Sequence, residues 1–98
     1  MKLLTASEQY QIVIPRDVEK EIKKIPKSDM VGVFEKLEQL AKSSVSLDVK
    51  KLAGFMNLYR LRYRDYRIIY EIQDTKLIIH VLLFGHRREI YGKLKKLH

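Results

Sequence analysis

Hydrophobic residues follow two periods along the chain, helical in the first half and alternating in the second. Residues 10–14, Tyr-Gln-Ile-Val-Ile, form a β-rich run that predicts a first strand. Pro15 ends this run and suits the first turn of a helix, and Pro26 predicts where that helix ends. Between the prolines, apolar residues recur at spacings of four and three, as on one helix face: Val18, Ile22 and Ile25.

A second helix is predicted between Pro26 and the polar residues 43–46, with Ser28 or Asp29 as its N-cap. Its apolar face consists of six residues: Met30, Val33, Phe34, Leu37, Leu40 and Ala41. Gly32 costs up to ~1 kcal/mol relative to alanine, which is too little to prevent the helix. We expect the two helices to form an antiparallel pair that covers one face of a sheet.

From Leu58 onward the period is two. The first strand of this half alternates between an apolar side and a side with three arginines: Arg60, Arg62 and Arg64. Two further strands are predicted at Tyr66–Gln73 and Leu77–Phe84, each preceded by a short polar turn. Gly85 is expected to end the last strand, and residues 89–97 can form a short helix.

The predicted order is β-α-α-β-β-β-α, an α+β fold in a single domain over residues 1–98. The N-terminal helical hairpin packs on a mainly antiparallel four-stranded sheet, and a short helix follows at the C-terminus. The chain has no cysteine, which excludes a disulfide framework and suits a reducing cytoplasm. No apolar run approaches the ~18 residues that a membrane span requires.

Positive charge is concentrated in the second half. Residues 1–50 carry nine Lys or Arg and eight Asp or Glu, whereas residues 51–98 carry eleven and four. Six of the seven arginines lie in this second half: Arg60, Arg62, Arg64, Arg67, Arg87 and Arg88. Scattered lysines would serve solubility equally well, but the planar fork of arginine matches phosphate. The pattern therefore favours a polyanionic partner such as nucleic acid.

Arg60 and Arg62 share one face of their predicted strand, and a tight turn at residues 64–65 places Arg62 directly opposite Arg67. Like charges in that position are destabilising by up to ~1 kcal/mol. An anion held between them offsets this repulsion, so we interpret these arginines as an anion site.

A second cluster lies at residues 85–91, Gly-His-Arg-Arg-Glu-Ile-Tyr. His86 has a reference pKa of ~6.5 and can move a proton near neutrality. Arg87 can stabilise charge that develops on a phosphorane, and Tyr91 can stack on a base or donate a proton. A surface histidine and a packing tyrosine are the plain alternatives. The sequence has no metal-ligand spacing and no phosphate-cradling glycine loop, so neither a metal nor another cofactor is expected.

The order of these motifs resembles the RelE toxins of prokaryotic toxin–antitoxin systems. The resemblance rests on four segments: residues 49–54 (Val-Lys-Lys-Leu-Ala-Gly), 58–62 (Leu-Tyr-Arg-Leu-Arg), 65–72 (Asp-Tyr-Arg-Ile-Ile-Tyr-Glu-Ile) and 85–91. It covers nearly half the chain. The tyrosine that follows the arginines favours the RelE branch over the ParE branch of the superfamily.

The resemblance implies a cytoplasmic mRNA interferase that enters the ribosomal A site and inhibits translation by cleaving the exposed codon. In this reaction the RNA 2′-hydroxyl attacks the adjacent phosphate and leaves a 2′,3′-cyclic phosphate and a 5′-hydroxyl, without a metal. The implied catalytic residues are Arg62, Arg67, His86, Arg87 and Tyr91. The implied RNA-binding residues are Lys51, Arg60, Arg62, Arg64 and Arg88.

Many relatives have lysine at the positions of Arg60 and Arg62. Lysine can lose a proton in a suitable environment, whereas arginine remains protonated in proteins. His86 is therefore the candidate general base of this sequence.

The resemblance also implies a cognate antitoxin, binding to operator DNA only through the toxin–antitoxin complex, and no membrane partner. Two alternatives share the fold: a ParE-like inhibitor of DNA gyrase without nuclease activity, and a degenerate relative that only binds its antitoxin or RNA. The distinguishing feature is whether His86, Arg87 and Tyr91 converge with Arg62 and Arg67 around one phosphate-sized hollow.

Overall fold

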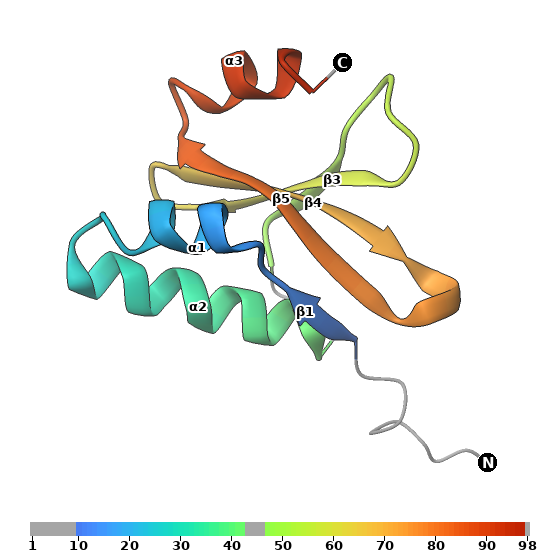
Figure 1. The fold of residues 1–98 in the computed structure, drawn as a ribbon, viewed down its shortest axis with the longest axis horizontal. Coiled ribbons are helices and arrows are strands. Elements are labelled where there is room, and N and C mark those ends of the chain that lie inside the picture. Colours follow the sequence, from blue (N-terminus) through green and yellow to red (C-terminus); the bar gives the residue numbers. More distant parts are fainter. Residues whose placement is uncertain (1–9, 43–46, 98) are drawn as a thin grey trace.

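The computed structural model describes residues 10–42 and 47–97, so the polar segment 43–46 predicted to follow the second helix lies outside the described residues (Figure 1). The elements are β1 (Gln11–Val13), α1 (Arg16–Ile22), α2 (Lys27–Ala41), β2 (Val49–Lys51), β3 (Leu58–Tyr63), β4 (Tyr66–Gln73), the 3-10 helix η2 (Asp74–Lys76), β5 (Ile78–His86) and α3 (Ile90–Lys95). This order confirms the predicted α+β fold, with β2 as an additional strand. None of the described helices is long and apolar enough to cross a membrane.

The strands form one mixed sheet in the order β1-β5-β4-β3-β2. β1 runs parallel to β5, and every other neighbouring pair is antiparallel. The sheet therefore has five strands, not the predicted four. The sequence did not reveal β2 because it is three residues long, lies at the edge and is exposed throughout, so it has no apolar alternation.

Both N-terminal helices begin directly after a proline. Pro15 and Pro26 occupy the N-cap positions, and neither helix has a side-chain cap. The predicted Ser28 or Asp29 cap of α2 is therefore wrong. The carboxylate of Asp29 instead accepts hydrogen bonds from Arg64 and Tyr66 on the sheet, which ties the first turn of α2 to the β3–β4 hairpin.

Each face of the sheet carries its own hydrophobic core. The α1–α2 hairpin covers one face (Figure 1), where Ile22 and Leu37 pack against Leu61, Ile68 and other strand residues. A smaller core on the opposite face contains four buried residues: Leu58, Ile69, Ile90 and Leu94. Since Ile90 and Leu94 belong to α3, this short helix covers part of the second face only.

The last strand continues through Gly85 to His86, so the predicted break at this glycine is wrong. Gly85 pairs with Arg67 in the β4–β5 ladder, which holds the strand beyond the glycine. A Cβ atom at this position would lie 3.3 Å from Nζ of Lys93. That ammonium group donates to the Phe84 carbonyl at 3.0 Å and pairs with Glu21 at 3.2 Å, so it connects α3 to β5 and α1.

Gly32 of α2 provides a test of the packing between α2 and the sheet. A Cβ atom there would lie 1.9 Å from the hydroxyl oxygen of Tyr63, so Gly32→Ala forces the tyrosine ring to move. We expect this substitution to lower the free energy of unfolding by about 1–3 kcal/mol, although alanine favours an isolated helix. Chemical denaturation measures the change.

The matched control is Gly92→Ala in α3, where a Cβ atom meets nothing within 4 Å. This variant should retain or gain stability. Tyr63→Leu should remove most of the cost of Gly32→Ala. Equal stability of the wild type and Gly32→Ala would contradict the assigned contact.

Candidate functional site

The β3–β4 hairpin places two arginines side by side. Its register pairs Arg62 with Arg67, as the tight turn predicted, and the turn residue Arg64 adopts a positive φ of 54°. The two side chains share the sheet face that carries α3. Cross-strand like charges repel each other, so this arrangement favours the binding of an anion.

Arg67 is the buried member of the pair, with 8% of its surface exposed. Its Nη1 donates to the carbonyl oxygens of Arg64 at 2.9 Å and Tyr66 at 2.8 Å. Within residues 10–42 and 47–97, no carboxylate forms an ion pair with it. Burial lowers the pKa of Arg67, and the positive charges of Arg62 and Arg60 lower it further. Its guanidinium group is therefore a desolvated cation that a bound anion would stabilise.

Arg87, in the turn after β5, and Tyr91, in the first turn of α3, complete the surroundings of Arg67. Arg87 also lowers the pKa of Arg67, whereas the phenol of Tyr91 has the opposite influence. The backbone N–H of Arg87 donates to the Asp65 carbonyl at 2.7 Å, and its Nε lies 3.6 Å from the Asp65 carboxylate. About half of the Arg87 side chain and of Tyr91 is exposed, so both groups can reach a ligand.

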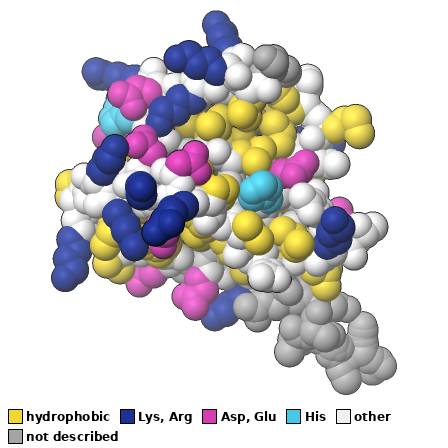
Figure 2. Space-filling view, in the orientation of Figure 1, with side chains coloured by type: hydrophobic (Ala, Val, Ile, Leu, Met, Phe, Trp, Pro, Cys, Tyr) yellow, Lys and Arg dark blue, Asp and Glu magenta, His cyan; other side chains and the backbone are white. Residues whose placement is uncertain are grey.

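We call Arg60, Arg62, Arg67 and Arg87 the arginine cluster. In Figure 2, Lys and Arg side chains line the left of the molecule, which in Figure 1 is the end of the sheet where β5 leads toward α3. The cluster can hold an oxyanion between Arg62, Arg67 and Arg87, because their donors approach from two strands and one turn. Tyr91 can place an aromatic ring beside that anion.

Asp48 is a component of the site that the sequence analysis did not identify. Its Oδ1 accepts a hydrogen bond from Nη2 of Arg60 at 2.9 Å, and its Oδ2 lies 3.8 Å from Nε of Arg62. Strand β2 brings this carboxylate to the arginines, and the same strand pairs Lys50 with Arg60. A sequence-based prediction that β2 pairs with β3 would have identified both Asp48 and Lys50.

Arg64 lies apart from the arginine cluster, so the prediction that it shares a face with Arg60 and Arg62 is wrong. Its Nη1 lies 2.7 Å from Oδ1 of Asp29 in α2, and its guanidinium carbon lies 5.2 Å from the ring centroid of Tyr63. The strand alternation ends at Tyr63, and the positive φ of Arg64 turns its side chain toward the α1–α2 side.

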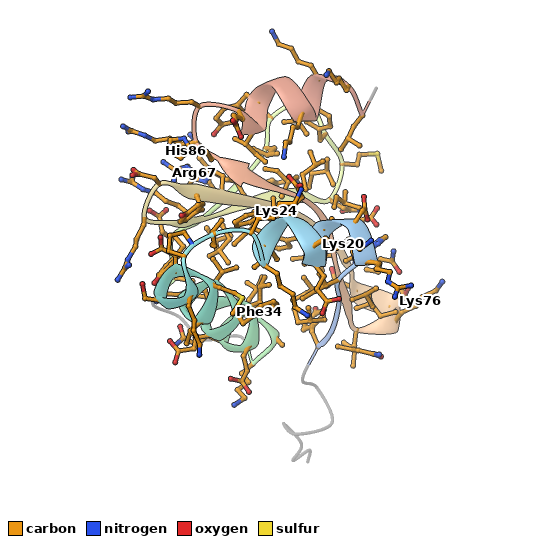
Figure 3. The ribbon with its side chains drawn as sticks, turned by 60° about the vertical axis from the view of Figure 1, so that its left-hand side comes forward. Lys20, Lys24, Phe34, Arg67, Lys76 and His86 are labelled. Atoms are coloured by element: carbon orange, nitrogen blue, oxygen red, sulfur yellow. The ribbon has the colours of Figure 1, made fainter. Side chains whose placement is uncertain are left out.

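His86 reaches the same end of the sheet as Arg67 (Figure 3). The register pairs His86 with Tyr66, so its side chain belongs to the face opposite Arg67. Its ring meets Tyr66 edge-on at a centroid distance of 6.3 Å, and Tyr66 stacks on Phe84 of the α1–α2 core. Nδ1 of His86 accepts a hydrogen bond from the backbone N–H of Arg88 at 3.2 Å. The structure therefore does not bring His86 to the arginine cluster.

Lys51 and Arg88 also lie outside the cluster. Lys51 pairs with Tyr59, a residue of the α1–α2 core face, so the β2 lysine on the arginine face is Lys50. Arg88 is exposed in the turn before α3 and forms no ion pair in the described part of the chain. The described residues also contain no group of three or more His, Cys, Asp or Glu that could hold a metal ion.

Comparison of the whole chain with known proteins identifies its family. The model of the ParE toxin of the type II toxin–antitoxin system parDE matches residues 12–91. Toxin RelE3 of Methanocaldococcus jannaschii is 39% identical over 49 residues, which are 50% of this chain and 53% of that protein. This chain thus spans about half the length of that curated relative.

Solved structures extend the similarity over most of the fold. The archaeal RelE–RelB complex from Pyrococcus horikoshii OT3 matches with a TM-score of 0.71 and 31% identity, over 81% of this chain and 96% of that chain. The RelB–RelE antitoxin–toxin complex from Methanococcus jannaschii matches with a TM-score of 0.69 and 26% identity, over 83% and 96%.

The chain therefore belongs to the RelE/ParE superfamily of toxins from type II toxin–antitoxin systems. Within this class, its relatives of known structure place it with the RelE toxins.

Pyrophosphate provides a test of the anion site. We expect pyrophosphate to raise the melting temperature of the wild type, because a ligand that binds only the folded state stabilises it. Arg62→Gln should reduce the rise by roughly half or more, since it removes one of the guanidinium groups around the anion. Differential scanning fluorimetry at constant ionic strength measures both values.

Arg64→Gln is the matched control, because it removes the same charge from the side chain that pairs with Asp29. Its pyrophosphate-induced rise should equal that of the wild type. A larger loss for Arg64→Gln than for Arg62→Gln would place the anion at the hairpin turn instead of the cluster.

Proposed function

We propose that this toxin is a ribosome-dependent mRNA endoribonuclease that inhibits translation. The observation that supports the proposal is Arg67, a buried guanidinium group without a carboxylate partner among the described residues, flanked by Arg62 and Arg87 and close to Tyr91. A phosphate group supplies the missing negative charge, and an adjacent nucleobase can stack on the tyrosine. The +8 charge of the chain favours the capture of RNA.

In the proposed reaction, the RNA supplies its own nucleophile. The 2′-hydroxyl attacks the adjacent phosphorus and the bond to the 5′-oxygen breaks, which leaves a 2′,3′-cyclic phosphate and a 5′-hydroxyl. Arg62 and Arg67 bind the non-bridging oxygens and hold the phosphate for in-line attack. Arg87 stabilises the additional negative charge of the phosphorane, and Tyr91 positions the base.

Proton transfer does not require a basic side chain in this proposal, because water takes the proton that the 2′-hydroxyl loses and supplies one to the departing 5′-oxygen. Arginine does not accept a proton at physiological pH, and the ring of His86 packs against Tyr66 on the other face of the sheet. Catalysis therefore rests on positioning and charge stabilisation. General base catalysis by His86 is the alternative, and it requires the ring to leave Tyr66 and reach across the end of the sheet.

We further propose that a cognate antitoxin binds and neutralises the toxin in the cytoplasm. The similar RelE chains from Pyrococcus horikoshii OT3 and Methanococcus jannaschii are both in complex with RelB. In the proposal, operator DNA is bound only through the toxin–antitoxin complex.

Inhibition of DNA gyrase is the second candidate function, because the family model that matches residues 12–91 is that of the ParE toxins. This function needs a protein-binding surface and no reaction at the arginine cluster. The two candidates therefore differ in whether substitutions of Arg67 and Arg87 abolish toxicity.

Brief expression without antitoxin should distinguish these functions. We expect new mRNA 5′ ends within translated codons, carrying 5′-hydroxyl groups, while plasmid supercoiling stays normal. Sequencing of 5′ ends with and without prior phosphorylation detects the breaks, and gel electrophoresis of a reporter plasmid reports supercoiling. Intact mRNA together with relaxed plasmid would favour the gyrase function.

Single-turnover cleavage on programmed ribosomes should separate Arg87 from its neighbours. Arg87→Ala should lower the rate by about 10²–10³-fold, because the phosphorane loses a charge partner. Arg88→Ala removes the same charge next to it and should change the rate by less than about fivefold.

His86→Ala should also change the single-turnover rate by less than about fivefold, whereas a loss near 10²-fold would identify His86 as the general base.

A further inference from the structure

The Asp48 carboxylate lies against two members of the arginine cluster. It contacts Arg60 at 2.9 Å and Arg62 at 3.8 Å, so two neighbouring guanidinium groups share one negative charge. Arg87 also has an acidic neighbour, Asp65 at 3.6 Å. Among the described members of the cluster, Arg67 alone has no carboxylate partner.

We propose that Asp48 is an internal competitor of RNA that holds Arg60 and Arg62 until a phosphate displaces it. The inference rests on the proposed function, because its ligand is the RNA backbone. It assigns two steps to binding: one phosphate binds at Arg67 and Arg62, and the next along the strand replaces the Asp48 carboxylate. Asp48 thereby lowers the affinity for RNA and restricts tight binding to RNA that is held in place by other contacts.

The exchange requires only the side chain of Asp48 to move, because its backbone is held in place. Its carbonyl accepts the Arg62 N–H at 2.9 Å, and the next residue, Val49, pairs with Leu61, so the main chain is held at the edge of the sheet. The carboxylate is about half exposed and can rotate into solvent. Because the backbone bonds already fix β2, the side chain is not needed to hold this strand.

Arg60 cannot follow the carboxylate when it leaves. Only 16% of its side chain is exposed, and its Nε is buried without a hydrogen-bond partner in the described part of the chain. An anion must therefore come to Arg60 where it lies. A phosphate that arrives while Asp48 is in place meets a like charge within a few ångströms, which is the origin of the competition.

The affinity for an uncleavable RNA tests this inference. The probe is a fluorescein-labelled oligonucleotide with 2′-O-methyl groups throughout, and fluorescence anisotropy at fixed salt measures its dissociation constant. We expect Asp48→Asn to bind about 3- to 10-fold more tightly than the wild type, since it releases two arginines and removes a repulsive charge. Glu38→Gln is the control for net charge, because Glu38 is an exposed α2 residue that pairs with Lys42. It should change the affinity by less than about twofold.

A double-mutant cycle assigns the gain to the two arginines. In an Arg60→Gln, Arg62→Gln background, Asp48→Asn should gain less than about twofold in affinity, because only the repulsive charge is then removed. A gain of the full size in that background, or an Asp48→Asn variant that binds no more tightly than the wild type, overturns the proposal. Asp48→Ser provides a second variant if the Asp48→Asn protein folds poorly. Its affinity is compared with that of the wild type only if the two proteins have the same melting temperature. Ribosomal mRNA cleavage by the wild type is scored separately, so a failure of this inference is distinguishable from a failure of the proposed nuclease function.

Discussion

The pairing of Arg62 with Arg67 is the constraint on which the rest of the site depends. The two-residue turn between Tyr63 and Tyr66 fixes this register, and a shift of β3 by one residue would move Arg60 and Arg62 to the sheet face opposite Arg67. The cost of two adjacent cations is compatible with folding because hydrophobic cores on both faces hold the strands together. An anion that binds between the two guanidinium groups relieves their repulsion, and this relief adds to the free energy of binding.

The unequal covering of the two sheet faces determines where this charge is accessible. The α1–α2 hairpin spans one face, whereas the six residues of α3 cover only the part of the other face around Ile69. Arg62 and Arg87, whose side chains are more than half exposed, carry the accessible charge of the cluster. Lys93 connects this helix to the Phe84 carbonyl and to Glu21, so the position of Tyr91 is tied to both layers of the fold.

The sequence predicted the elements in which hydrophobic residues recur at regular spacing. It missed the features that depend on where a strand begins or ends. Alternation in residues 58–73 was sufficient for the pairing of Arg62 with Arg67. His86 was placed with the arginines because it directly precedes Arg87, after the glycine at which the strand was expected to end. The strand continues, so His86 follows Phe84 onto the α1–α2 face. Asp48 and Lys50 were missed because a three-residue exposed strand has no apolar pattern.

A site built from arginine also limits how its activity can be controlled. Guanidinium groups remain charged throughout the physiological pH range, even where burial lowers the pKa as at Arg67. The cluster therefore cannot be turned off by losing its protons, as a lysine or histidine site can. Its charge can only be neutralised by another anion, and the one that the fold supplies beside Arg60 and Arg62 is Asp48. In the proposed function, the affinity of this site for RNA is thus set by competition between the phosphate and Asp48, a property determined by the geometry of the sheet edge.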